Sequence, residues 1–199
     1  MSLQSFQRAV VDLTLSPWTA GELREDGARW LAGYDLTGRE RDRLLDIVTQ
    51  RGISVNCSLS RGNRFEIIAQ AFPMTCVLLR PLLRSLVDEL WQQHRPTNYQ
   101  LFGEEIAFAA IVKRKIAAGQ LVIEYLEEIF AYEIACLELI QRMRMDPNAK
   151  VTTIVEFQHS PDDLLPPLSQ LRAPPGKLPA GSYRALINLQ GEQFKVELL

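Results

Sequence analysis

The spacing of the apolar residues constrains this chain more than any other feature, and it changes once along the sequence. Up to about Met145 the apolar residues recur every three or four positions, which is the spacing of amphipathic helices. Beyond Asp146 the chain is rich in proline, and residues 147–199 hold seven of its eleven prolines. We therefore expect a mainly α fold, with a helical bundle at residues 1–146 and a small α+β module at residues 147–199.

Start and stop signals divide the first region into several helices. Thr37 and Glu40 have the T-x-x-E spacing of a capping box, and Gly52 is a plausible end for the helix that follows. Pro73 predicts an interruption. A later helix has an apolar face of Ile106, Ala109, Ala110 and Ile116 and ends at Gly119. The longest helix carries one apolar stripe, made of Leu121, Tyr125, Ile129, Tyr132, Cys136, Leu139 and Met143.

The second region predicts three strands and one short helix. Residues 151–157 are mostly β-branched or aromatic, which favours a strand. Ser160-Pro161 followed by two acids is typical of a helix start, and Pro166 and Pro167 should end that helix early. Residues 183–189 and 193–198 read as two further strands, joined by a hairpin turn at Gln190-Gly191. The tail therefore predicts a β-α-β-β module.

The charge balance and the scarcity of reactive residues exclude several classes of protein. Lys and Arg total 22 against 24 for Asp and Glu, and this near-neutral balance argues against a dedicated nucleic-acid binder. The three cysteines lie far apart in sequence, which favours reduced thiols, and no stretch predicts a signal peptide or a membrane-spanning helix. We expect a cytoplasmic protein with no contact with membranes.

Catalytic and metal-binding motifs are not found in the sequence. The longest helix is rich in glutamate, but none of these residues has a histidine three positions later, as carboxylate-bridged di-iron sites usually require. A solvated acidic face is the favoured interpretation. The sequence has no G-x-S-x-G, phosphate-binding loop or G-x-G-x-x-G motif. We therefore expect no catalytic residue, metal or cofactor in this chain, and no enzyme activity of its own.

Two groups of residues are candidates for binding. A strand at the edge of the small sheet could pair with an extended peptide. As this peptide-binding strand we nominate Tyr183, Arg184, Ala185, Leu186 and Ile187. The equally favoured alternative is that these strands only pack on the helices. Four arginines are spaced so that they could line one face across two helices and bind a partner: Arg61, Arg64, Arg80 and Arg84. Scattered surface arginines with intramolecular partners remain the favoured alternative for this group.

Three blocks of sequence carry a resemblance to a known family. The first is Tyr34-Asp35-Leu36-Thr37, Arg39-Glu40-Arg41 and residues 51–57, and the second is Arg61-Gly62-Asn63-Arg64 with residues 71–75. The third is Leu126-Glu127-Glu128-Ile129, Tyr132-Glu133 and Ala135. Together they resemble the bacterial putative DNA-binding domain family, and more closely the small partner subunits of multinuclear non-haem iron-dependent oxidases. Such oxidases act in ribosomal peptide (RiPP) natural-product pathways of the methanobactin and thiaglutamate type.

The resemblance implies a heterodimer in which the oxidase, on another chain, holds the iron. This chain would be a non-catalytic accessory subunit that helps to recruit the leader of a ribosomally made precursor peptide. An alternative hypothesis is a transcriptional regulator that uses residues 37–70 as a helix-turn-helix. A third hypothesis is a helical enzyme with a carboxylate metal site.

Overall fold

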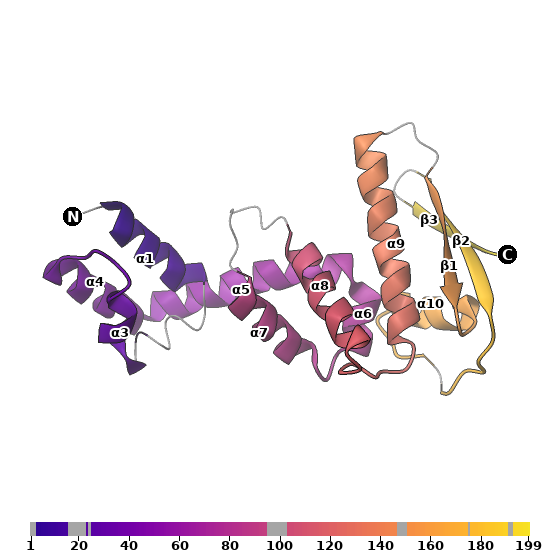
Figure 1. The fold of residues 1–199 in the computed structure, drawn as a ribbon, viewed down its shortest axis with the longest axis horizontal. Coiled ribbons are helices and arrows are strands. Elements are labelled where there is room, and N and C mark those ends of the chain that lie inside the picture. The colour runs from indigo at the N-terminus through magenta and orange to yellow at the C-terminus, as the bar shows by residue number, and fades with distance from the viewer. Residues whose placement is uncertain are drawn as a thin grey trace. The chain divides into compact units, whose positions relative to one another are not determined.

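The computed structural model describes residues 3–15, 23, 25–94, 103–146, 151–174, 176–190 and 193–199 (Figure 1). Within these ranges the chain is mainly helical, with a small antiparallel sheet in its C-terminal region, which confirms the predicted fold class. The helices are α1 (Leu3–Leu15), α3 (Gly27–Leu31), α4 (Gly38–Thr49), α5 (Arg51–Ala71), α6 (Pro73–Leu78), α7 (Leu83–Gln93), α8 (Glu104–Ala117), α9 (Leu126–Met145) and α10 (Pro161–Ser169). The strands are β1 (Thr152–Phe157), β2 (Tyr183–Gln190) and β3 (Gln193–Leu198).

The chain forms two compact units, each with its own core. The first comprises Met1–Ile67 and Val87–Glu104, and the second comprises Ile68–Leu86 and Glu105–Leu199. The change from helices to strands near residue 146 lies inside the second unit. The predicted division into domains at residue 146 therefore corresponds to a change in secondary structure, and as a domain boundary it stays a prediction.

The capping box predicted in the first unit is present. The Thr37 backbone N–H donates to Glu40 Oε2 over 2.8 Å, and the Glu40 N–H donates to Thr37 Oγ1 over 3.3 Å. The predicted end of α4 at Gly52 is wrong, because the helix ends at Thr49 and Gly52 lies inside α5. The extended backbone of Gln50, with ψ of 140°, separates the two helices, so no glycine is needed there.

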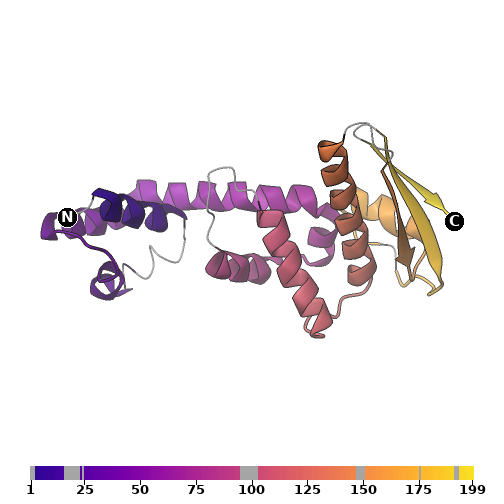
Figure 2. The ribbon, with the colours of Figure 1, turned by 45° about the horizontal axis from the view of Figure 1, so that its top comes forward.

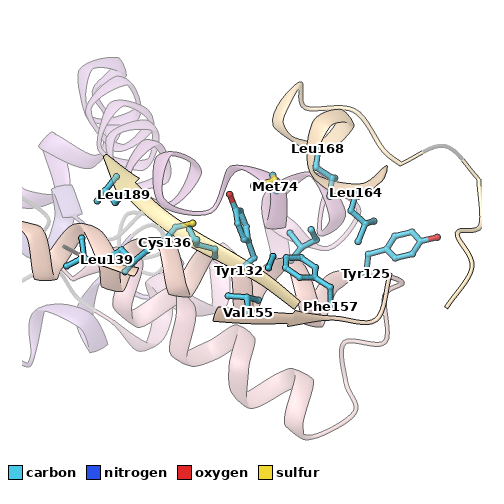
Figure 3. Close-up of a cluster of buried hydrophobic side chains, with 14 residues drawn as sticks. Met74, Tyr125, Tyr132, Cys136, Leu139, Val155, Phe157, Leu164, Leu168 and Leu189 are labelled. Carbon is cyan, nitrogen blue, oxygen red and sulfur yellow. The ribbon is translucent and has the colours of Figure 1, made fainter. Parts of the chain in front are cut away.

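The second unit is built around α9. The predicted stripe on this helix packs in one buried cluster with residues of β1, β2 and α10, as Figure 3 shows for Tyr132, Cys136 and Phe157. The prediction placed Leu121 and Tyr125 on this helix, but both precede it. Tyr125, with a φ of 67°, belongs to the cluster, and Leu121 is buried outside it. The interruption at Pro73 is confirmed, since α5 ends at Ala71 and Pro73 begins α6.

The sheet has the order β1-β2-β3, and both pairs are antiparallel. The three predicted strands are confirmed. Of the predicted turn at Gln190-Gly191, Gln190 belongs to β2 and pairs with Gln193, and Gly191 lies outside the described residues. The prediction that Pro166 and Pro167 end the short helix is wrong, because α10 continues to Ser169. Leu164 and Leu168 on this helix are both fully buried, and their packing offsets the backbone hydrogen bonds that the two prolines cannot donate.

The face that α8 buries differs from the predicted one. Ile106, placed on the predicted apolar face, is 62% exposed, whereas Phe108, Ile111 and Val112 are buried. Because α8 is apolar on more than one side, the spacing alone did not distinguish the face that packs in the core.

Candidate functional site

The second unit contains a groove between α8, α9 and the outer edge of β1. Its volume is ≈ 750 Å³. It is lined from α8 by Ala109, Ala110, Lys113, Ile116 and Ala117, from α9 by Glu127, Phe130, Ala131, Ile134, Ala135 and Glu138, and from β1 by Ile154, Val155 and Glu156. Three of the four residues predicted as the apolar face of α8 therefore line this groove.

The edge of β1 that borders the groove carries unpaired backbone groups. Leu189 N–H donates to the Val151 carbonyl over 3.3 Å, so residues 151 and 189 form a hydrogen-bonded pair of the antiparallel ladder. Such pairs recur at every second residue, and the alternate residues Thr152, Ile154 and Glu156 direct their N–H and C=O groups away from β2. Within the described residues no backbone group pairs with them.

The floor of the groove is apolar. Phe130 and Val155 are 6% and 7% exposed, and the small side chains of Ala131 and Ala135 lie between the bulkier residues of α9. Ile154 is 46% exposed although it is a large apolar residue. This surface therefore presents apolar side chains directly beside the unpaired backbone of β1.

The charged residues of the groove are predominantly acidic. Glu127, Glu138 and Glu156 line it together with Lys113, and all four side chains are exposed. Three carboxylates and one ammonium group leave a formal charge of −2 on the lining residues. The electrostatic environment therefore favours a ligand that carries positive charge.

Two buried carboxylates on α9 hold neighbouring segments in place. Glu128 accepts hydrogen bonds from the backbone amides of Gln158 and His159, over 2.8 and 3.1 Å, and its Oε1 lies 2.6 Å from His159 Nδ1. These contacts attach the end of β1 to the first turn of α9. The sheet edge and the helix face that form the groove are thereby fixed relative to each other.

The second carboxylate lies five residues further along α9. Glu133 accepts hydrogen bonds from the Met74 and Thr75 amides at the start of α6, over 2.7 and 2.9 Å. Burial raises the pKa of Glu133 to about 7, and these hydrogen bonds oppose the shift. The prediction of a solvated acidic face is wrong for Glu128 and Glu133, which are 8% and 3% exposed, because backbone amides of other segments bind them.

The nominated peptide-binding strand is the central one. Residues Tyr183 to Ile187 lie in β2, which pairs with β1 on one side and β3 on the other. The prediction that they form an edge is therefore wrong, and a peptide cannot add to their backbone. Ala185 and Ile187 are fully buried, Arg184 is exposed, and Tyr183 and Leu186 are half-buried. Peptide contact through these side chains stays a prediction.

The four candidate arginines do not form one described surface. Arg61 and Arg64 belong to the first unit, and Arg80 and Arg84 to the second. Arg64 is only 2% exposed and lies 2.7 Å from Glu104, so it is not available to a partner. Arg80 and Arg84 are exposed, and Arg80 donates a 3.4 Å hydrogen bond to the Leu171 carbonyl. Partner binding by the three other arginines stays a prediction.

A second hollow, in the first unit, is polar. It has a volume of ≈ 620 Å³ and is lined by Arg8, Asp12, Glu25, Asp26, Arg29, Trp30, Gly33 and Tyr34. Tyr34 donates a 2.6 Å hydrogen bond to Asp12, so part of this polar surface is already satisfied internally.

The buried thiols are poor nucleophiles at neutral pH. Cys76 and Cys136 are free and buried, as predicted, and burial raises the pKa of each to about 12. The side chain of Cys57 lies outside the described residues.

Across the described ranges, no three His, Cys, Asp or Glu residues are grouped so that they could hold a metal ion. No helix in the same ranges has the length and apolar character needed to cross a membrane.

Sequence reasoning missed the groove residues of α9 and β1. A signal was present on α9, where Phe130 and Ile134 form a second apolar stripe beside the stripe that enters the core. A helix with two apolar faces can pack one face in the core and line a groove with the other.

No protein-family model matches this chain, and no curated protein or solved structure is significantly similar to it.

Proposed function

We propose that this chain is a non-catalytic accessory subunit that binds an extended peptide along the outer edge of β1 and recruits it to an iron-dependent oxidase on another chain. The observation that carries this proposal is the unpaired backbone of β1 beside an apolar, acidic groove. The peptide in question is the leader of a ribosomally made precursor.

The backbone of β1 matches the repeat of an extended peptide. Thr152, Ile154 and Glu156 offer one N–H and one C=O each toward the groove, at every second residue. Successive groups are roughly 7 Å apart, which is also the two-residue repeat of a peptide in the β conformation. A peptide that adds here extends the sheet to four strands and gains backbone hydrogen bonds that do not depend on its sequence.

The side chains of the groove select among such peptides. A strand laid beside β1 directs every second side chain toward α9, onto Phe130 and the alanines around it. Apolar residues at alternate positions of the peptide would cover this surface. Basic residues near them would complement Glu127, Glu138 and Glu156. We therefore infer a ligand in which apolar and basic residues alternate.

The partnership with an oxidase is supported by a different observation. The residues that line the groove are alanine, isoleucine, valine, phenylalanine, glutamate and lysine, and they include no histidine, cysteine or serine. Its titratable side chains are three glutamates and one lysine, and all four are exposed to solvent, whereas catalytic acids and bases are typically set apart by burial. The sequence blocks that resemble oxidase partner subunits supply the identity of the chain that would perform the reaction.

The alternative of a transcriptional regulator has less support. Residues 37–70 form α4 and α5, and Gln50 alone separates the two helices. A helix-turn-helix has a turn of about three to four residues between its helices, and that turn is missing here.

Co-expression with an iron-dependent oxidase encoded beside this chain tests the partnership. We expect the two chains to elute together from a sizing column in moderate salt and to separate only after denaturation. Independent elution at all protein concentrations would contradict the proposal.

Peptide binding is tested with two synthetic probes. One fluorescent peptide alternates valine with lysine, and its counterpart alternates valine with glutamate. Fluorescence anisotropy should show at least tenfold tighter binding of the lysine peptide, because two or more carboxylates of the groove lie beside its basic residues. Equal binding of both peptides, or of neither, would contradict the proposed site.

Two variants locate the peptide. Ile154→Pro removes an N–H that faces the groove and leaves the β1–β2 hydrogen bonds intact, so it should weaken binding. Ala131→Phe fills the groove and should weaken it further. Val196→Pro is the matched control, because it places the same residue on the other open edge of the same sheet, and it should leave peptide affinity unchanged.

A further inference from the structure

The sheet has a second open edge, on β3, which has no part in the proposed function. The Leu199 N–H donates to the Arg184 carbonyl over 2.8 Å, so residues 184 and 199 are a hydrogen-bonded pair. The alternate residues Phe194, Val196 and Leu198 therefore direct their backbone groups away from β2. Figure 2 shows β3 at the side of the sheet that lies away from α9.

The side chains of this edge are apolar on one face and charged on the other. Val196 and Leu198 are 36% and 47% exposed, and together with the half-buried Phe194 they extend the apolar face of the sheet. Lys195 and Glu197 point to the opposite face and are exposed. An open strand with an apolar face is a template for pairing with another strand unless its charges prevent it.

The charges of β3 permit pairing with a second copy in one register. If two β3 strands lie antiparallel about a two-fold axis at Val196, Lys195 of each copy faces Glu197 of the other. Shifting the axis to Lys195 or Glu197 instead places like charges opposite each other, which is unfavourable. The favourable register is thus selected by complementary charge.

The hydrogen-bond pattern is compatible with the same register. With the axis at Val196, the outward N–H and C=O groups of Phe194, Val196 and Leu198 in one copy meet those of Leu198, Val196 and Phe194 in the other. The apolar side chains of the same three residues then adjoin across the axis. Backbone geometry and apolar contact are therefore compatible with this arrangement, and charge distinguishes it from the neighbouring registers.

We propose that β3 is a self-association surface, through which two copies of this chain form a symmetric dimer with a continuous six-stranded sheet. The interface is isologous, since each strand presents the same surface to its copy. The site is separate from the groove beside β1, so peptide binding and dimerisation are independent of each other.

Sedimentation velocity over a wide range of protein concentrations tests this proposal. The wild-type chain should pass from monomer to dimer as its concentration rises. Lys195→Glu and Glu197→Lys should each weaken the dimer at least tenfold, because two opposite-charge pairs become two like-charge pairs. Lys177→Glu makes the same charge change at an exposed loop position of the second unit and should leave the dimer unchanged.

Mixing the variants provides the decisive result. A chain with Lys195→Glu carries two acidic residues on β3, and a chain with Glu197→Lys carries two basic ones. Their equimolar mixture restores both opposite-charge pairs and should dimerise at least as well as the wild type, although neither variant does so alone. Circular dichroism of each variant verifies that it is folded.

Val196→Pro supplies a second measurement that does not depend on charge. It removes the outward N–H at the two-fold axis and leaves the β2–β3 hydrogen bonds in place, so it should abolish the dimer. A wild-type chain that stays monomeric at every concentration would overturn the proposal. A dimer that withstands both the charge variants and Val196→Pro would overturn it as well.

Discussion

The two units of this chain neutralise their buried charges in different ways. In the first unit, Arg64 and Glu104 are 2% and 1% exposed, and Arg64 Nε lies 2.7 Å from Glu104 Oε1. The guanidinium also donates to the His94 carbonyl over 2.8 Å and lies over the Trp91 ring. In the second unit, the carboxylate of Glu133 is bound by two backbone amides of another segment.

This difference determines how each unit responds to pH. Burial lowers the pKa of Arg64, and Glu104 opposes that change, so the guanidinium stays charged at any pH at which the protein is folded. Burial raises the pKa of Glu133 to about 7, and the hydrogen bonds from Thr75 and Met74 offset this effect only in part. We therefore expect the contribution of the Arg64–Glu104 pair to stability to be independent of pH near neutrality, and the contribution of Glu133 to depend on it.

The largest effect is expected when the ion pair of the first unit is broken. Arg64→Met leaves the Glu104 carboxylate buried without its partner and should lower the free energy of unfolding by about 3–5 kcal/mol. Urea denaturation measures this change. Arg142→Ala is the matched control, because Arg142 and Glu138 are 59% and 58% exposed and 3.8 Å apart, and such pairs contribute about 0–1 kcal/mol. If both substitutions lowered the free energy of unfolding equally, the buried pair would contribute no more than an exposed one, and the contrast between the units would be wrong.

The second unit should be sensitive to pH through Glu133. The pKa of Glu133 in the folded chain lies above its usual value of 4.5, so the folded state retains a proton that the unfolded state has released. The stabilisation from this proton is complete below pH 4.5 and is lost as the pH rises through about 7. Two and a half pKa units correspond to about 3 kcal/mol.

Glu133→Gln removes this titration. The cost of the substitution should be largest in mild acid and should shrink by about 3 kcal/mol when the pH is raised above 7, as measured by urea unfolding at a series of pH values. The same series on Arg142→Ala, which leaves no buried charge behind, should give a constant difference from the wild type between pH 6 and about 8. A pH-independent cost of Glu133→Gln would show that Glu133 is ionised throughout.

A smaller effect is expected at Glu128, which attaches β1 to α9. Glu128→Gln weakens the acceptor of two backbone amides and of the His159 ring, and should cost about 1–3 kcal/mol. Hydrogen exchange should show faster exchange of the Gln158 and His159 amides in this variant. Unchanged exchange at these two amides would mean that Glu128 does not hold the end of β1.

Much of the local structure could be predicted from the sequence, because short-range patterns determine it. The capping box at Thr37 is complete within four residues, and the β-branched and aromatic residues in 152–157 favour a strand without information from elsewhere. The stripe on α9 was predicted for the same reason, since residues three and four apart on one helix share a face.

The binding surfaces depended on contacts between distant residues. Strand order cannot be read from the pattern of a strand, so β2 was taken for an edge when β1 and β3 are the edges. An arginine on a helix is typical of a surface residue, and only the approach of Glu104, forty residues away, explains why Arg64 is buried.

The sequence by itself thus determined the class of the fold and the extent of most elements, because hydrogen bonding and apolar spacing within each element are local. The tertiary structure alone decided which apolar face of α8 enters the core and which lines a groove, and which strands keep unpaired backbone groups. Those choices follow from the packing of segments far apart in the chain, and the proposed functions of this protein depend on them.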